Sequence, residues 1–140
     1  MIRKFQKCDL EDVLDIWLEA SIIAHDFIKS NYWISEISNM RYIYIPNSET
    51  YVYENENGIC GFFSLHEKTL AAIFVKPNQQ GKGIGSKLLK KAKELRKSLI
   101  LAVYKENSKS VLFYRKAGFR FVKERIDENT GHPELIMQWP

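Results

Sequence analysis

The sequence predicts a mixed α/β fold in which helices are layered on a single sheet. Three observations support this class. Short apolar or alternating segments typical of strands recur along the chain, amphipathic segments lie between them, and no internal repeat or linker interrupts the order. The 140 residues suffice for one layered core and are too few for two ordinary domains, so we expect residues 1–140 to form one domain.

The N-terminal part of the chain predicts a strand followed by two helices. Residues 2–6 alternate apolar and polar side chains, as a strand does. Asp9 then resembles a helix N-cap, and apolar residues recur at helical spacing over 10–18. A second segment with helical spacing covers 26–37, so this region holds two helices or one helix broken near His25.

The middle of the chain predicts three strands. Residues 51–53 and 59–65 flank a turn that contains Asn and Gly, a pattern typical of a hairpin. Residues 70–75 form a short continuous apolar run, which predicts a central strand buried on both faces.

The C-terminal half alternates helices and strands. After a glycine-containing loop, apolar spacing predicts a helix over 88–95, and a second helix over 108–116 ends at Gly118. Strands are predicted at 99–103, 119–126 and 135–139. The predicted order is therefore strand, two helices, three strands, helix, strand, helix and two strands.

The composition excludes several classes of protein. Apolar residues make up 45% and charged residues 27%, which is typical of a globular chain and not of a disordered one. Because the chain has no apolar run of about 18 residues and no apolar leader, we expect a cytoplasmic protein without a membrane partner. Cys8 and Cys60 lack the spacing of metal ligands, so we expect buried free thiols and no metal.

The net charge of +4 raises the question of a nucleic-acid-binding module. Many of the lysines gather in and after the glycine loop, where a polyanionic small ligand would also attract them. No nucleic-acid-binding motif is present in the sequence. We therefore expect no nucleic acid among the partners, and salt-dependent retention on DNA would be needed to revive that alternative.

The strongest chemical signal is the junction between the strand at 70–75 and the helix that follows it. Gly81, Gly83 and Gly85 lie in this loop, where unpaired backbone N–H groups and the positive end of the helix dipole form a seat for an anion. A P-loop is excluded because Gly85 is followed by Ser86 and Lys87 in the wrong order, and the spacing does not match a dinucleotide fingerprint either. The loop therefore predicts a phosphate site of another kind.

Two motifs of the chain resemble the GNAT superfamily of acyl-CoA-dependent N-acyltransferases. The stretch from Gln80 to Gly85, Gln-Gly-Lys-Gly-Ile-Gly, is similar to the family loop [Q/R]-x-x-G-x-[G/A]. The stretch from Asn107 to Phe119 is similar to the family pattern N-x(6)-Y-x(3)-G-F, with Tyr114 at the tyrosine position. The resemblance covers essentially the whole chain and is strongest to small bacterial members of the YiaC and YjaB type.

The resemblance implies a mixed, mostly antiparallel sheet splayed between its two central strands, with helices on both faces. It implies transfer of an acetyl group from acetyl-CoA directly to a primary amine. It also implies roles for particular residues. The cofactor-binding residues would be Ile73, Phe74 and Val75 along pantetheine, Gln80, Gly81, Lys82, Gly83, Ile84, Gly85 and Ser86 around the pyrophosphate, and Asn107 on the cofactor arm. Tyr114 would lie beside the sulfur and assist the leaving thiol, and a backbone N–H near Phe74 would stabilise the oxyanion.

The acceptor side is less specified by the sequence. Related enzymes often carry a glutamate five residues before the motif asparagine to deprotonate the amine, and here Ala102 occupies that position. Acceptor-side or base candidates are His25, His66, Glu67 and Tyr32. The acceptor is either a protein lysine or a small-molecule amine, and the protein is a monomer or a homodimer. Without a base, a non-catalytic acyl-CoA sensor is the alternative function.

Overall fold

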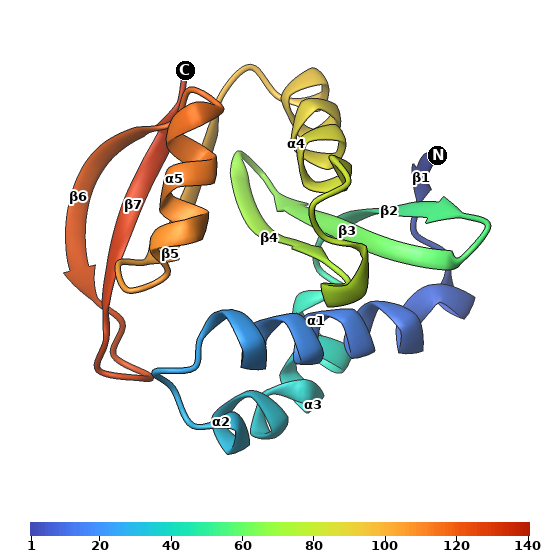
Figure 1. Ribbon diagram of the computed structural model, residues 1–140, viewed down its shortest axis with the longest axis horizontal. Coiled ribbons are helices and arrows are strands. Elements are labelled where there is room, and N and C mark those ends of the chain that lie inside the picture. Colours follow the sequence, from blue (N-terminus) through green and yellow to red (C-terminus); the bar gives the residue numbers. More distant parts are fainter.

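The computed structural model describes all 140 residues and contains one seven-stranded sheet with helices on both faces (Figure 1). The strands are β1 (Ile2–Lys4), β2 (Glu49–Asn55), β3 (Gly58–His66), β4 (Thr69–Val75), β5 (Leu99–Tyr104), β6 (Arg120–Ile126) and β7 (Pro133–Trp139). The helices are α1 (Leu10–Ala24), α2 (Ser30–Ser35), α3 (Ile37–Asn39), α4 (Ile84–Leu95) and α5 (Ser108–Lys116), with short 3-10 or π turns η1 (Lys7–Asp9), η2 (Met40–Tyr44) and η3 (Pro77–Gln79). None of these helices is long and apolar enough to cross a membrane.

The sheet consists of two halves that meet at one parallel pair. The strand order is β1-β2-β3-β4-β5-β7-β6, and every neighbouring pair except β4 and β5 is antiparallel. β4 and β5 share a single register pair, Thr69 with Ile100, and diverge beyond it. The predicted element order and the mostly antiparallel, splayed sheet are thereby confirmed.

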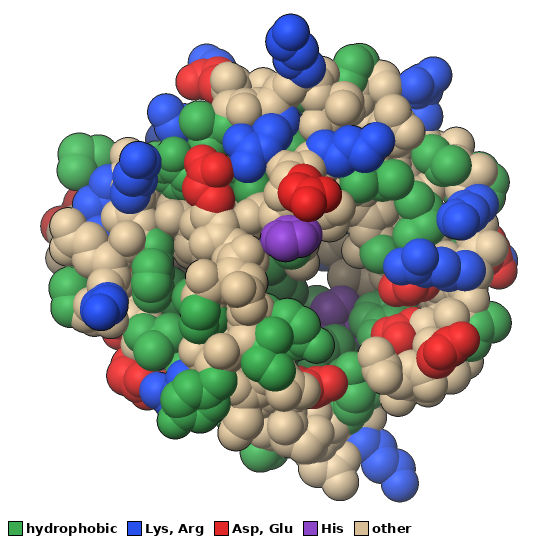
Figure 2. All heavy atoms as spheres, turned by 180° about the vertical axis from the view of Figure 1, so that it is seen from behind, with side chains coloured by type: hydrophobic (Ala, Val, Ile, Leu, Met, Phe, Trp, Pro, Cys, Tyr) green, Lys and Arg blue, Asp and Glu red, His purple; other side chains and the backbone are tan.

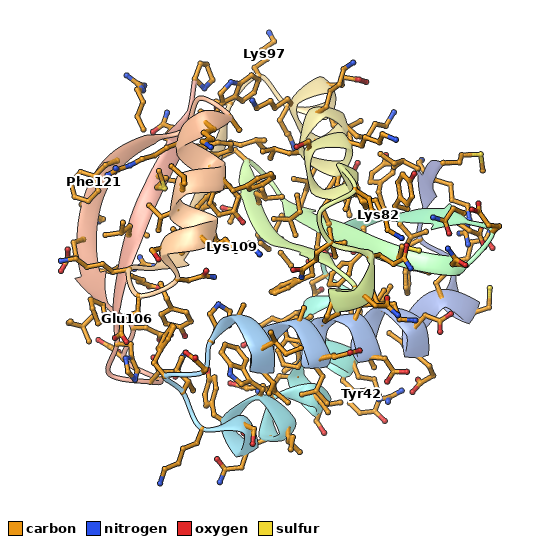
Figure 3. The ribbon with its side chains drawn as sticks, viewed as in Figure 1. Tyr42, Lys82, Lys97, Glu106, Lys109 and Phe121 are labelled. Atoms are coloured by element: carbon orange, nitrogen blue, oxygen red, sulfur yellow. The ribbon has the colours of Figure 1, made fainter.

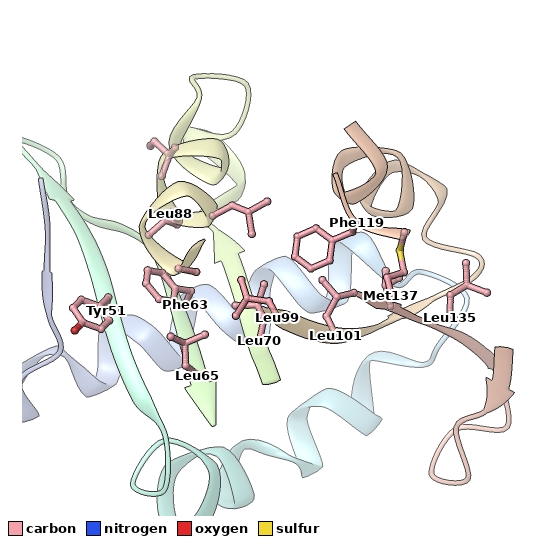
Figure 4. Close-up of a cluster of buried hydrophobic side chains, with 14 of the residues drawn as sticks. Tyr51, Phe63, Leu65, Leu70, Leu88, Leu99, Leu101, Phe119, Leu135 and Met137 are labelled. Carbon is pink, nitrogen blue, oxygen red and sulfur yellow. The ribbon is translucent and has the colours of Figure 1, made fainter. Parts of the chain in front are cut away.

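Each face of the sheet has its own buried core. Successive residues of a strand point to opposite faces, so Phe63 packs on the α4 and α5 side and Phe62 packs on the α1 side. Figure 4 shows the first of these clusters, in which Leu88 of α4 and Phe119 before β6 lie over the same face. Because this core is continuous across both half-sheets, it holds them together although β4 and β5 barely pair.

Asp9 is the N-cap residue of α1, as predicted, but its side chain has another role. Its carboxylate makes no capping hydrogen bond to α1 and is buried against Arg3 of β1, with oxygens 2.8 and 3.0 Å from the guanidinium nitrogens. It also accepts a hydrogen bond of 2.7 Å from the backbone N–H of Gln6. The hydrogen bonds from Arg3 hold the pKa of Asp9 below its usual range. Asp9 therefore fixes the turn between β1 and α1.

The break near His25 is confirmed, but the second helix is shorter than the predicted segment 26–37. Lys29 is extended, with φ −59° and ψ 138°, so α2 starts only at Ser30. The chain then continues through α3 and the π turn to β2. As a result, α2 folds back beside α1 and packs Trp33 edge-on against Trp17, with ring centroids 5.9 Å apart.

The prediction that residues 70–75 are buried on both faces is wrong. Only Leu70 is buried, and the remaining residues of this stretch are half-buried or exposed. The physical reason is the divergence of β4 from β5, which leaves one edge of the strand without a neighbour. The expected burial of both thiols also fails in part, because Cys60 is buried and Cys8 is exposed in η1.

Candidate active site

The divergence of β4 and β5 opens a cleft of about 780 Å³ through the middle of the molecule. Its walls come from both diverging strands, the end of α1, Trp33 of α2, and the first turns of α4 and α5. Figure 2 shows a hollow on the back face, bordered by hydrophobic and acidic side chains. Most of the predicted site residues line this cleft, and they are Ile73, Phe74, Val75, Gln80, Gly81, Gly83, Ile84, Gly85, Ser86, Asn107, Tyr114 and His25.

The first turn of α4 forms one side of the cleft and presents backbone N–H groups to it. Gly83 is the N-cap of α4 and is left-handed, with φ 84° and ψ 6°, and Gly81 has φ 79°. A Cβ built on either residue would meet nothing within 4 Å, so the space in front of the loop is open. Unpaired N–H groups at a helix start attract an anion, and the open space lets it approach the backbone. The loop therefore fits a pyrophosphate.

Two polar side chains shape this loop. Gln80 turns back and donates a hydrogen bond of 3.1 Å from Nε2 to the carbonyl of Val75, which ties the loop to the end of β4. Lys82 lies 3.3 Å from the Gln79 side-chain oxygen and does not line the cleft. Lys109, which the sequence analysis did not single out, lines the cleft and extends from α5 toward the space between α5 and β4 (Figure 3). Its ammonium adds positive charge opposite the loop.

Tyr114 of α5 lines the cleft from the opposite wall. Its ring packs against Phe113 and Phe119, at centroid distances of 5.4 and 5.7 Å. The hydroxyl forms no hydrogen bond with the protein, and burial raises the pKa of the phenol above its usual value. The side chain is therefore protonated at neutral pH and free to donate a hydrogen bond into the cleft.

Asn107 connects α5 with the end of α1. As the N-cap of α5, it accepts a hydrogen bond of 3.3 Å at Oδ1 from the N–H of Ser110. Its Nδ2 then lies 3.2 Å from Nε2 of His25 and donates to it, so the proton of the neutral imidazole sits on Nδ1. Both polar ends of the Asn107 amide are therefore engaged within the protein.

His25 is buried in an aromatic environment. Its ring stacks on Trp33 at 5.0 Å and meets Tyr104 edge-on at 5.2 Å. Burial lowers the pKa of His25 to about 4, which keeps the imidazole neutral at physiological pH. Together with Trp17, these rings make an apolar wall of the cleft. We call this wall, formed by Trp17, His25, Trp33 and Tyr104, the aromatic wall.

Acidification should destabilise the fold through His25. The folded protein binds this proton less readily than the unfolded chain, whose histidine pKa is near 6.5. The stabilisation is therefore complete above pH 6.5 and is lost as the pH falls toward 4, by about 3 kcal/mol at most. Urea unfolding of the wild type and His25→Gln at several pH values measures this, and the variant should show a flatter dependence over that range. Identical slopes would contradict the assignment.

Three predicted acceptor-side residues do not line the cleft. His66 ends β3 and Glu67 lies in the exposed turn to β4, and the imidazole Nδ1 is 3.2 Å from the carbonyl of Asn47. This turn is at the closed end of the split, next to the single β4–β5 pair. Tyr32 packs edge-on against the outer side of Trp33, and burial raises its pKa to about 12. These three residues therefore lie outside the cleft.

Two polar residues that line the cleft were missed by the sequence analysis. Tyr104 ends β5, and its hydroxyl donates a hydrogen bond of 2.5 Å to Oδ2 of Asp127. Glu134 of β7 lines the cleft with a side chain that is 14% exposed. No local motif marks either of them, since both reach the cleft through strand pairing between β5 and β7.

The fold and the cleft together define a class of enzyme. The start of α4, with its unpaired N–H groups, the free edge of β4, the aromatic wall and the Tyr114 phenol all line one cleft. This arrangement suits the transfer of an acyl group from a nucleotide-linked thioester to an acceptor at the aromatic wall.

Comparisons with known proteins give the family. The acetyltransferase (GNAT) domain family matches residues 46–121. Peptidyl-lysine N-acetyltransferase YiaC of Escherichia coli K12 is 37% identical over 141 aligned residues that span 100% of this chain and 97% of that protein. The chain belongs to the GNAT family of acetyltransferases.

Solved structures agree with this assignment. The apo form of YjaB from Escherichia coli has a TM-score of 0.87 and 26% identity, covering 99% of this chain and 96% of that one. The PaiA N-acetyltransferase of Thermoplasma acidophilum in complex with coenzyme A has a TM-score of 0.84 at 23% identity, over 99% and 96% of the two chains. The protein is thus an N-acetyltransferase that uses acetyl-CoA and an amine, which favours the enzyme over the non-catalytic sensor.

Proposed function

We propose that the protein acetylates the ε-amino group of lysine residues in proteins. The observation that carries this proposal is the composition of the cleft, which is lined by the aromatic wall and by a single carboxylate, Glu134. A lysine side chain has an apolar stem and one ammonium, which matches these surroundings. A polyamine carries several ammonium groups and would need several carboxylates. The name of the 37% identical relative YiaC, a peptidyl-lysine N-acetyltransferase, supports the same acceptor class.

Acetyl-CoA would enter along the opposite part of the cleft. In this proposal the N–H groups of residues 80–86 bind the pyrophosphate, and pantetheine pairs with the free edge of β4 at residues 73–75. The ammonium group of Lys109 would attract the phosphates electrostatically. Asn107 orders the first turn of α5 beside the cofactor arm through its bonds to Ser110 and His25. The thioester then ends between Tyr114 and the aromatic wall.

The chemistry would proceed by direct attack. The neutral amine adds to the acetyl carbonyl, and a backbone N–H of β4 near Phe74 stabilises the oxyanion. As the tetrahedral intermediate collapses, the Tyr114 hydroxyl donates its proton to the departing thiolate. The apolar packing of Tyr114 against Phe113 and Phe119 keeps the phenol oriented for this step. No covalent acyl-enzyme is required, because neither cysteine lines the cleft.

The acceptor class can be tested with a panel of amines. Purified protein and acetyl-CoA would be incubated with lysine-containing peptides, the same peptides with lysine replaced by arginine, spermidine, free amino acids and aminoglycosides. Thiol release gives the rate, and mass spectrometry locates the acetyl group. We expect transfer to lysine peptides only. Faster transfer to spermidine or an aminoglycoside than to every peptide would overturn the lysine proposal.

We also propose the cytoplasm as the compartment of the protein. Its cosubstrate is acetyl-CoA, and its two cysteines, Cys8 and Cys60, are free thiols. Whether the protein is a monomer or a homodimer stays a prediction, and light scattering on the purified chain would measure it.

A further inference from the structure

The cleft contains one acidic side chain. Of the residues that line it, only Glu134 carries a carboxylate, and the other ionisable groups are His25, Tyr104, Lys109 and Tyr114. An alkyl ammonium with a pKa of about 10 must lose a proton before its nitrogen can attack a thioester. The ammonium must therefore give up a proton before attack, and a basic side chain in the cleft would accept it directly.

The strand register places Glu134 beside the position where the usual glutamate is absent. β5 and β7 are antiparallel, with Tyr104 opposite Glu134 and Ala102 opposite Ile136. Residues directly opposite in a sheet project to the same face, so Ala102, Tyr104 and Glu134 share one face. Glu134 is the diagonal neighbour of Ala102, at a Cβ separation of about 7 Å or less. Ala102 and Glu134 both line the cleft, so a carboxylate is present one diagonal position away from the usual one.

The surroundings of Glu134 leave one oxygen available. Its Oε1 accepts a hydrogen bond of 2.7 Å from Nε of Arg125, the residue opposite it on β6. Its Oε2 has no hydrogen-bond partner in the protein. The Arg125 side chain is 54% exposed, so it holds the carboxylate from the outer rim, and the second oxygen of this cleft-lining residue makes no bond within the protein.

The other ionisable groups of the cleft cannot accept the proton. Nε2 of His25 already accepts from Asn107, and Nδ1 carries the ring proton, so the imidazole has no free lone pair. Tyr104 donates its own proton to Asp127, and burial raises its pKa further. Lys109 is an ammonium, and Tyr114 is needed protonated at the sulfur.

We propose that Glu134 is the general base of the acetyl transfer and replaces, from the neighbouring strand, the glutamate that is missing at Ala102. This proposal rests on the proposed function in one respect only, namely that the amine is that of a lysine side chain. Oε2 takes one proton from the ammonium, which leaves a neutral amine and a protonated Glu134. The amine forms the C–N bond, the C–S bond breaks, and Tyr114 protonates the sulfur. The amide nitrogen then loses its second proton, which restores Tyr114 through solvent, and Glu134 releases its proton to water.

The first test compares Glu134→Gln with the wild type. The amide keeps the size of the side chain and removes the base, so we expect kcat for a lysine peptide to fall by about 100-fold or more. The dissociation constant of CoA, measured by calorimetry, should stay unchanged because the loop around Gly83 is remote from β7. Glu124→Gln is the matched control, since Glu124 pairs with Lys105 outside the cleft and its loss should leave kcat unchanged.

Two further measurements separate a base from a merely structural carboxylate. Adding Ala102→Glu to Glu134→Gln places a glutamate at the usual position. The double variant should have a kcat at least about tenfold higher than that of Glu134→Gln alone. A peptide whose lysine amine is replaced by an alkoxyamine, which is unprotonated at neutral pH, should react with the variant nearly as fast as with the wild type. If Glu134 only bound the ammonium, KM would rise while kcat stayed constant.

The two proposals fail in different ways. If the wild type acetylates another amine and no lysine peptide, the lysine proposal is overturned and the same variants are compared on that amine. If Glu134→Gln turns over its best substrate at the wild-type kcat, the base proposal is overturned whatever the acceptor. The base proposal would also be overturned if adding Ala102→Glu failed to raise kcat and if Glu134→Gln slowed the alkoxyamine reaction as much as the lysine reaction.

Discussion

Replacing Tyr114 with phenylalanine is expected to lower kcat by about 10²- to 10⁴-fold and to leave the affinity for CoA unchanged. The phenol hydroxyl has no hydrogen bond within the protein, so its removal takes away nothing that holds the fold. The rings of Phe113 and Phe119 pack against the part of the side chain that phenylalanine retains. The lost interaction is the one to the leaving thiolate, which forms only as the C–S bond breaks.

The measurement is steady-state thiol release together with calorimetric titration of CoA. Tyr42→Phe is a suitable control because Tyr42 is 72% exposed and points away from the cleft (Figure 3). Thermal unfolding of all three proteins should coincide. If Tyr114→Phe had the kcat of the wild type, Tyr114 would not be the proton donor, and the departing thiolate would be protonated by solvent.

The fold could be predicted from the sequence because its elements are encoded by local periodicity. The alternating strand at 2–6 and the apolar spacing of α1 need no knowledge of tertiary contacts. The role of Asp9 could not be predicted in this way. Its partner Arg3 lies six residues earlier on another element, and only the packing of β1 beside α1 brings the two charges together. The same holds for β4. Its exposure results from its divergence from β5, which the apolar sequence of the strand does not predict.

The active site likewise has a part that a local motif identifies and a part that depends on contacts between distant segments. The loop from Gln80 to Gly85 is contiguous, and its function depends on backbone groups of one turn, so a motif identifies it. Glu134 and Tyr104 come from strands 30 residues apart in the chain and become neighbours through the register of β5 with β7. The resemblance to related acetyltransferases pointed to Ala102 as the position of a missing base, and it gave no means of finding the carboxylate on the adjacent strand.

Replacing Gly83 with valine is expected to weaken CoA binding by about 100-fold and to lower the free energy of unfolding by about 1–2 kcal/mol. Gly83 is left-handed at the N-cap of α4, a conformation that a β-branched residue adopts only with strain. Relief of that strain would rotate the peptide and redirect the N–H groups that face the pyrophosphate. The hundredfold loss corresponds to about one charge-assisted hydrogen bond. Calorimetry and urea unfolding measure the two effects.

The control separates backbone strain from ligand binding. Gly58, the first residue of β3 after the turn from β2, has the same left-handed conformation with φ 88°, and a Cβ there also meets nothing within 4 Å. Gly58→Val should therefore lose similar stability and keep the CoA affinity of the wild type. Gly83→Asn adds a side chain that tolerates the left-handed region, so its stability should be close to the wild type while a group now occupies the approach to the loop. If the asparagine variant binds CoA as tightly as the wild type, close approach at Gly83 is unnecessary, and only the backbone conformation of the loop determines affinity.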